Sequence, residues 1–256
     1  MRWLSPNPSK RWAEIFLLVY SPIWIAVITT CELTKVFAHW GDLGHLLFGF
    51  ALALPIWLVP LVRPGAADRA LPFADRHITR LNVFILGWTL VQVWFGSDLF
   101  FDFLGMEYHF PVTWTAHRTP LFLYLVTIAY FSTYYAVMQI VWRGFRTGWP
   151  SAPLLLRVVV LCALGYAVAF AETSGMATDM MSDYFRYRDK RFTLLYGSLC
   201  YGTIFAVSLP LVYRLDEEAQ PDGIRTLRSL LWDACAANTV VLMFYAVYAA
   251  LVTRPR

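Results

Sequence analysis

Seven long apolar segments, separated by short polar connections, make up most of the chain. Each segment is close to the roughly 20 residues that a helix needs to cross a hydrocarbon core of about 30 Å. The segments lack the period-two alternation of barrel strands, and only helices or closed barrels satisfy backbone hydrogen bonds in lipid. The pattern therefore predicts an all-α, polytopic membrane bundle of about seven transmembrane helices, with residues 1–256 forming a single domain. The predicted segments are Ala13–Cys31, Leu43–Val62, Leu81–Phe101, Pro120–Trp142, Leu154–Ala171, Leu194–Tyr213 and Trp232–Val252.

The basic residues predict the orientation of the bundle. With the N-terminus inside, 13 of the 21 lysines and arginines fall in cytoplasmic segments and eight in exterior segments. The positive-inside rule then favours a cytoplasmic N-terminus and an exterior C-terminus. Arginine supplies 18 of the 21 basic residues, a bias compatible with a GC-rich bacterial genome. We expect the inner membrane if the source is bacterial and the endoplasmic reticulum if it is eukaryotic.

Composition narrows the class of protein. A hydrophobic content of 59% and a mean hydropathy of +0.53 exclude a soluble globular protein. The net charge of +4 is spread through the connections, which argues against nucleic-acid binding. The four cysteines fall in or beside apolar segments without a CxxC pair, so we interpret them as small buried apolar residues.

The connection after the fifth segment is unusually rich in charge. It is interpreted either as a solvated loop whose charges neutralise one another or as a lid over a membrane-facing cavity. If it instead folds back into the protein, the number of segments is wrong by one. Its charged residues are Asp179, Asp183, Arg186, Arg188, Asp189, Lys190 and Arg191.

The sequence gives little support to a metal or nucleotide site. His39, Asp42 and His45 are spaced by three residues, but the chain has five histidines and no second histidine cluster. A di-iron hydroxylase would need several such clusters. No GxGxxG or Walker loop occurs. We therefore expect neither a metal nor a cofactor.

Three carboxylates within or beside the apolar segments are candidates for proton chemistry. They are Glu14 near the start of the first segment, Asp98 in the third and Glu172 after the fifth. Burial disfavours the charged form, so such an acid can stay protonated near neutral pH and donate a proton. The alternative is an interfacial residue that pairs with arginine or caps a helix, most plausible for Glu14 beside Lys10 and Arg11.

Aromatic residues supply the surroundings for a lipophilic ligand. Phe, Trp and Tyr make up 17% of the chain, and the run from Tyr130 to Tyr135 puts rings and hydroxyls inside the fourth segment. Most of these residues are expected in packing and interfacial belts. The others can line a flat pocket, where ring faces stabilise a cation.

The opening from Asn7 to Glu14, followed by Tyr20-Ser21-Pro22, resembles the start of the cycloeucalenol cycloisomerases, a family of plant sterol enzymes. No single match is diagnostic, but the matches continue in order across nearly the whole chain. The other matching segments are Ala67-Asp68-Arg69, Asp75-Arg76, Asn82, Leu104-Gly105, Tyr108-His109-Phe110-Pro111, Glu172-Thr173, Ser208-Leu209-Pro210, Arg214-Leu215-Asp216-Glu217 and Trp232-Asp233-Ala234.

This resemblance implies an isomerase that takes a sterol from the bilayer and opens the cyclopropane ring of a 9β,19-cyclosterol to give a Δ8 sterol. A proton is delivered to the bridging methylene and another is removed from C8, so nothing is oxidised and no cofactor is needed. As our own hypothesis, Glu172 is the general acid and Glu14 or Asp98 is the base or a second acid. The residues assigned to substrate binding are Tyr134, Trp94, Tyr108, Thr173 and Asp189.

Two other functions remain open. A non-enzymatic sterol or lipid carrier would share an aromatic cavity, but its ligand binding would not depend on a buried acid. A transporter would be expected to show an inverted repeat with broken helices near the midplane. The two halves of the sequence show no convincing similarity to each other.

Overall fold

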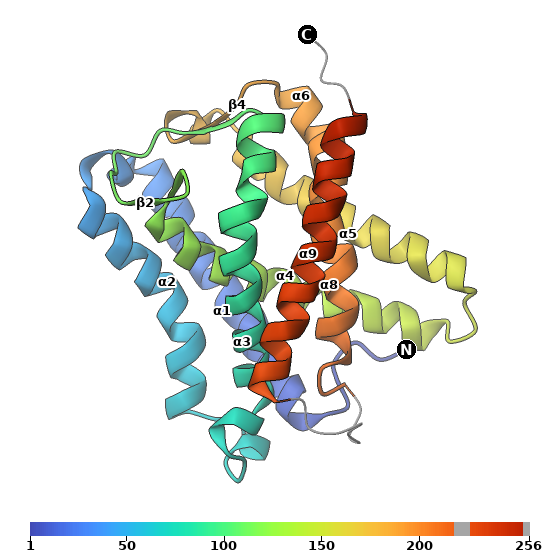
Figure 1. Ribbon diagram of the computed structural model, residues 1–256. Helices are drawn as coiled ribbons and strands as arrows, with labels where there is room; N and C mark the ends of the chain where they lie inside the picture. Colours follow the sequence, from blue (N-terminus) through green and yellow to red (C-terminus); the bar gives the residue numbers. More distant parts are fainter. Residues whose placement is uncertain (218–225, 253–256) are drawn as a thin grey trace.

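The computed structural model describes residues 1–217 and 226–252, and it confirms an all-α, polytopic membrane bundle (Figure 1). Within these residues, seven helical segments are long and apolar enough to cross a membrane. Arg225, Arg254 and Arg256, which entered the predicted orientation, lie outside the described residues. The segments are α1 (Pro8–Leu33), α2 (Asp42–Val62), α3 (His77–Val91) with its continuation to Phe103, α4 (Leu121–Gly148), α5 (Leu154–Met176), the run from α6 (Lys190–Phe192) to α8 (Thr203–Arg214), and α9 (Leu227–Leu251).

Helix α1 begins at Pro8, before the predicted start at Ala13, because its polar first turns have partners within the protein. The Asn7 side chain accepts hydrogen bonds from the backbone N–H groups of Ser9 at 2.9 Å and Lys10 at 3.3 Å. This is a favourable N-cap, and proline in the first turn suits a helix start. The Lys10 side chain is fully buried. Hydropathy alone cannot predict this helix start, because a lysine scores as strongly polar whether or not it has a buried partner.

The helices pack in pairs. Helix α3 lies beside α9, α2 packs on α4, and α5 packs on α8 (Figure 1). Helix α4 and the sixth span are the most enclosed of the seven described spans, whereas α5 is the least enclosed. In so exposed a helix, a polar side chain is shielded from the surroundings only where another element packs on it. For α5, that element is mainly the sixth span.

The third and sixth spans are not continuous α-helices. The third passes from α3 into the π-helical segments η4 (Gln92–Gly96) and η5 (Leu99–Phe103). The sixth contains α6, the π-helical segment η7 (Thr193–Gly197), α7 (Ser198–Tyr201) and α8. Such wide turns redirect side chains and occur frequently at functional sites. Here they flank one end of the bundle.

The charged connection after α5 folds back over that end without changing the number of spans. Its strand β4 (Phe185–Tyr187) pairs antiparallel with β1 (Met106–Tyr108), which follows η5. Lys35, just after α1, forms an ion pair with Asp183 of the connection at 2.9 Å. The connection is therefore attached to two other parts of the fold. The remaining short elements are η1 (Val36–His39), η2 (Ala66–Asp68), η3 (Phe73–Asp75), η6 (Met180–Asp183) and the paired strands β2 (Thr115–Ala116) and β3 (Thr119–Pro120).

Candidate active site

Three adjoining hollows meet near the C-terminal end of α5. The inner cavity, about 130 Å³, lies between η4, η5, α4, α5, α7, β1 and β4. The middle cavity, about 90 Å³, lies chiefly between α1, α4 and α5, and the lateral groove, about 560 Å³, runs chiefly between the same three helices. Glu172 and Met176 line all three hollows. The lateral groove is large enough for a lipophilic ligand, and Glu172 is the carboxylate that all three hollows share.

Glu172 has hydroxyl partners. Its Oε2 accepts a hydrogen bond of 2.7 Å from the Tyr201 hydroxyl, and Tyr134 is a second hydrogen-bonding neighbour. Among the described residues, no lysine, arginine or histidine forms an ion pair with Glu172. A carboxyl group held by hydroxyls and not by a cation can exist as a neutral acid or as a stabilised anion. The side chain thus meets the requirements for donating a proton to a ligand.

A set of tyrosines surrounds this carboxyl group. Burial, with a further contribution from Glu172, raises the pKa of the Tyr108 hydroxyl above its usual value, and the same two causes raise the pKa of Tyr187. These phenols therefore stay neutral at physiological pH and can serve as hydrogen-bond donors. The tyrosines that interact electrostatically with Glu172 include Tyr108, Tyr130, Tyr134, Tyr187 and Tyr201.

Three of the substrate-binding residues predicted from the sequence lie with Glu172. Tyr108 lines the inner and middle cavities, Thr173 lines the inner cavity, and Tyr134 lines the lateral groove. Tyr134 and Thr173 are on different helices, and Tyr108 is on β1. The tertiary structure therefore brings these four residues together from three separate elements.

The sequence prediction did not include Glu32. This residue is on the last turn of α1, is only 8% exposed, and lines both the middle cavity and the lateral groove. It directly follows Cys31, the predicted end of the first apolar segment, so the apolar pattern does not include it. Lys35, three residues later, binds Asp183. Among the described residues Glu32 therefore has no cation as a partner, which only the path of the connection after α5 reveals.

Glu14 lies in a different part of the bundle. Its carboxylate forms an ion pair with Arg143 at 2.5 Å and accepts a hydrogen bond from the backbone N–H of Ser5 at 3.0 Å. Glu14 lines none of the three hollows. It precedes Glu32 by 18 residues of the same helix, or roughly 27 Å of helix axis. The structure therefore does not bring Glu14 to Glu172.

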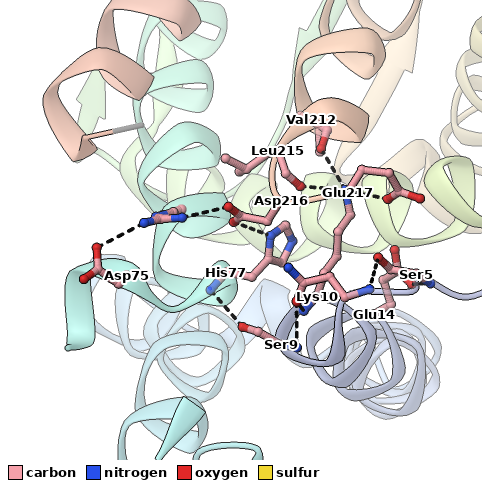
Figure 2. A network of polar contacts seen from close by, with 12 residues as sticks. Ser5, Ser9, Lys10, Glu14, Asp75, His77, Val212, Leu215, Asp216 and Glu217 are labelled. Carbon is pink, nitrogen blue, oxygen red and sulfur yellow. Dashed lines mark hydrogen bonds and ion pairs between the residues drawn. The ribbon is translucent and has the colours of Figure 1, made fainter. Parts of the chain in front are cut away.

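The surroundings of Glu14 form a buried ionic network (Figure 2). Lys10 pairs with Glu217 at 3.1 Å, and Arg143 bridges Glu217 and Glu14. Beside this group, Asp216 binds His77 at 2.9 Å and Arg80 at 2.7 Å. Although burial opposes it, hydrogen bonds from Arg143 and His77 hold the pKa values of Glu217 and Asp216, respectively, below their usual values. The network ties the start of α1 to α3, α4 and the end of α8.

Asp98, Trp94 and Asp189 also lie outside the three hollows. Asp98 is half exposed and binds His117 at 2.9 Å, and Trp94 stacks on the same imidazole with a centroid separation of 5.3 Å. Asp189 caps α6 by accepting a hydrogen bond from the backbone N–H of Phe192 at 2.9 Å. These three residues therefore contact other protein groups and do not line the hollows that contain Glu172.

Among the described residues, no group of three or more histidine, cysteine, aspartate and glutamate side chains is arranged to hold a metal ion. The titratable groups that face the hollows are carboxyls and phenols. The chemistry that these groups support is proton transfer.

Comparison with known proteins identifies one relative. The chain is 31% identical over 222 residues to cycloeucalenol cycloisomerase from Arabidopsis thaliana, a match that covers 85% of this chain and 78% of the relative. No protein-family model matches the chain. No solved structure matches it. The match confirms the family that the sequence motifs resemble.

Proposed function

The chain belongs to the cycloeucalenol cycloisomerase family, and we propose that it opens the 9β,19-cyclopropane ring of a membrane cyclosterol to give a Δ8 sterol. The observation that carries the proposal is the position of Glu172, held by hydroxyls where three hollows meet. The Arabidopsis relative, a cycloisomerase by name, supports the same reaction class.

In this proposal the Glu172 carboxyl group is the acid. Its proton forms a new C–H bond to the bridging methylene as the bond between that carbon and C9 breaks, which leaves a cation at C9. Loss of the C8 proton then places the C–H electron pair in the new double bond. One proton is gained and one is lost, so the reaction is a redox-neutral isomerisation. The Tyr201 hydroxyl, 2.7 Å from Glu172, stabilises the carboxylate that remains.

The lateral groove is suited to a flat, largely apolar substrate. The lateral groove is lined mainly by apolar and aromatic side chains of α1, α4 and α5, and within it Trp24 and Tyr130 pack edge to face with centroids 4.7 Å apart. Ring faces of this kind stabilise a nearby cation. We propose that a sterol enters sideways from the bilayer through the groove and reaches Glu172 there. By the same proposal, the membrane is the inner membrane of a bacterium or the endoplasmic reticulum of a eukaryote.

The test uses the full chain, purified in detergent and supplied with cycloeucalenol. We expect the ring-opened Δ8 product without any added cofactor, and in deuterated water one deuterium in the new methyl group. Glu172→Gln keeps the shape and the hydrogen bonding but lacks the acidic proton. Its turnover should fall at least about 100-fold, in line with the usual contribution of general acid catalysis, while cycloeucalenol still binds.

Glu107→Gln is the matched control, because Glu107 is an exposed carboxylate that lines none of the hollows. It should retain wild-type turnover. Full activity of Glu172→Gln would contradict the assignment of the acid. Binding of cycloeucalenol and other cyclopropyl sterols without any conversion by the wild type would instead indicate a sterol carrier.

A further inference from the structure

We propose that Glu32 is a second catalytic residue of this site, the group that accepts the proton leaving C8. The inference rests on the proposed ring-opening reaction, and it names the residue that accepts the proton released from C8. The geometry that points to Glu32 is a buried carboxyl group without a partner among the described residues, facing two of the three hollows that Glu172 lines.

The side chain of Glu32 is available to a ligand. It is 8% exposed, and among the described residues it forms neither a hydrogen bond nor an ion pair through its carboxyl group. The nearest candidate cation in the sequence, Lys35, is engaged with Asp183 at 2.9 Å. A structural carboxylate in such a place would be expected to have a partner, because burying an unpaired polar group costs free energy. The absence of one indicates that the partner is a ligand.

Glu32 and Glu172 face the same ligand space from opposite helices. Both line the middle cavity and the lateral groove, Glu32 from α1 and Glu172 from α5. Tyr130 of α4 lines the same two hollows and interacts electrostatically with both carboxyl groups. A rigid polycyclic molecule that fills either hollow therefore contacts both residues. The two carboxyl groups can then act on the bridging methylene and on C8, two carbon atoms that are both bonded to C9.

The different partners of Glu172 and Glu32 indicate which is the acid and which is the base. Hydrogen bonds to Glu172 stabilise its anion and make its acid form a better proton donor. Among the described residues Glu32 has no such donor, so its carboxylate is open to take up a proton from the ligand. The reaction starts from the form in which Glu172 carries a proton and Glu32 is a carboxylate.

The protons balance over one turnover. Glu172 gives its proton to the bridging methylene as the bond to C9 breaks, and the Glu32 carboxylate then takes the proton from C8 as the double bond forms. The pair ends with a carboxylate at Glu172 and a carboxylic acid at Glu32. Transfer of one proton from Glu32 to Glu172 restores the starting form.

The test compares Glu32→Gln with the wild type, using cycloeucalenol in deuterated water. We expect product formation to fall at least about 100-fold with cycloeucalenol affinity unchanged. Because the acid is intact, the cation should still form and collapse back to the ring, so recovered cycloeucalenol should gain deuterium at the bridging methylene. Glu172→Gln should give neither product nor exchanged substrate. A merely structural role of Glu32 would not produce this exchange.

Glu107→Gln is again the control and should behave like the wild type. Product formation by Glu32→Gln within a few-fold of the wild type would overturn the inference, as would a loss of activity that merely follows a loss of sterol binding. If Glu32→Gln does not fold, Glu32→Asp is tested with C8-deuterated cycloeucalenol. An unchanged rate of C8–D cleavage overturns the proposal, and a slower rate supports it. Failure of the wild type to convert cycloeucalenol is a different result, because it contradicts the proposed function itself.

Discussion

Glu172 and Glu32 face the same hollows with different partners. Glu172 accepts hydrogen bonds from phenols, whereas Glu32 has no partner among the described residues. Tyr201 contributes most directly to this difference, since its hydroxyl is 2.7 Å from Glu172. Single hydroxyl groups at this site are therefore expected to affect the rate more than the fold.

The Tyr201→Phe variant tests this expectation. It removes one hydrogen bond to the Glu172 carboxylate and keeps the aromatic ring, which packs edge to face on Phe100 with centroids 5.1 Å apart. A hydrogen bond to a charged group contributes about 1.5–3 kcal/mol, so turnover should fall by roughly 10-fold to 100-fold. Steady-state turnover of cycloeucalenol measures this. Tyr196→Phe, an exposed position on the same span, is the control, and equal rates for the two variants would contradict a role for the Tyr201 hydroxyl.

At the scale of elements, the crossing of α5 over the sixth span positions Glu172. A Cβ added at Gly165 would lie 2.5 Å from the carbonyl oxygen of Gly202, and one added at Gly202 would lie 2.9 Å from the backbone nitrogen of Tyr166. Glycine at both positions permits this close approach. Gly202 follows Tyr201 directly, and Glu172 lies two helical turns after Gly165. The crossing therefore sets the distance between the Glu172 carboxyl group and its phenol.

Gly165→Leu should separate α5 from the sixth span. Overpacking a close contact costs about 1–3 kcal/mol or more, so we expect a lower thermal midpoint in detergent together with a loss of turnover. Cys162→Leu is the matched control, because Cys162 is exposed on the same helix and an added leucine there would face outward. If Gly165→Leu retained both stability and turnover, this crossing would not be what positions the acid.

At the scale of the whole molecule, α1 connects two polar regions of opposite character. Its first turns belong to the ionic network of Figure 2, and its last turn carries Glu32. In the network the carboxylates are paired, as Glu217 is with Lys10 and Arg143. At the hollows the carboxyls have no cation among the described residues. The network is therefore expected to stabilise the fold, and the proposed chemistry belongs to the hollows.

The network predicts how stability depends on pH. The pKa values of Asp216 and Glu217 are below the ordinary values of 3.8 and 4.5, because hydrogen bonds and charges from His77, Arg80, Arg143 and Lys10 outweigh burial. A carboxyl with a lowered pKa stabilises the fold above its ordinary pKa, and this contribution is lost as the pH falls through the folded-state value. The carboxyl contribution should therefore make the thermal midpoint in detergent fall as the pH drops below about 5.

Glu217→Gln identifies the source of this acid sensitivity. Breaking a buried ion pair costs about 3–5 kcal/mol, so the variant should be less stable at neutral pH and should lose less further stability in acid. Asp179→Asn, at a fully exposed position, should leave both quantities unchanged. A Glu217→Gln variant with wild-type stability would show that the network does not stabilise the bundle.

The sequence by itself determined the number of spans, the class of fold and the family, because apolar length is a local property and the family motifs are short segments. It also made Glu172 a candidate site residue, since an acid that ends a long apolar run without a cation one turn before it is visible along the chain. The cytoplasmic N-terminus stays a prediction from the distribution of arginine and lysine.

Only the tertiary structure decided which polar residues meet. Glu14 and Glu32 are both acids near the ends of α1, yet Arg143 from α4 neutralises the first, while the second faces the hollows because Lys35 binds Asp183. The ends of the helices were also misjudged where buried pairs extend them past the apolar run, as at Lys10. These outcomes depend on contacts between residues far apart in the chain, and the free energy of a buried charge is set by such partners and not by its neighbours in sequence.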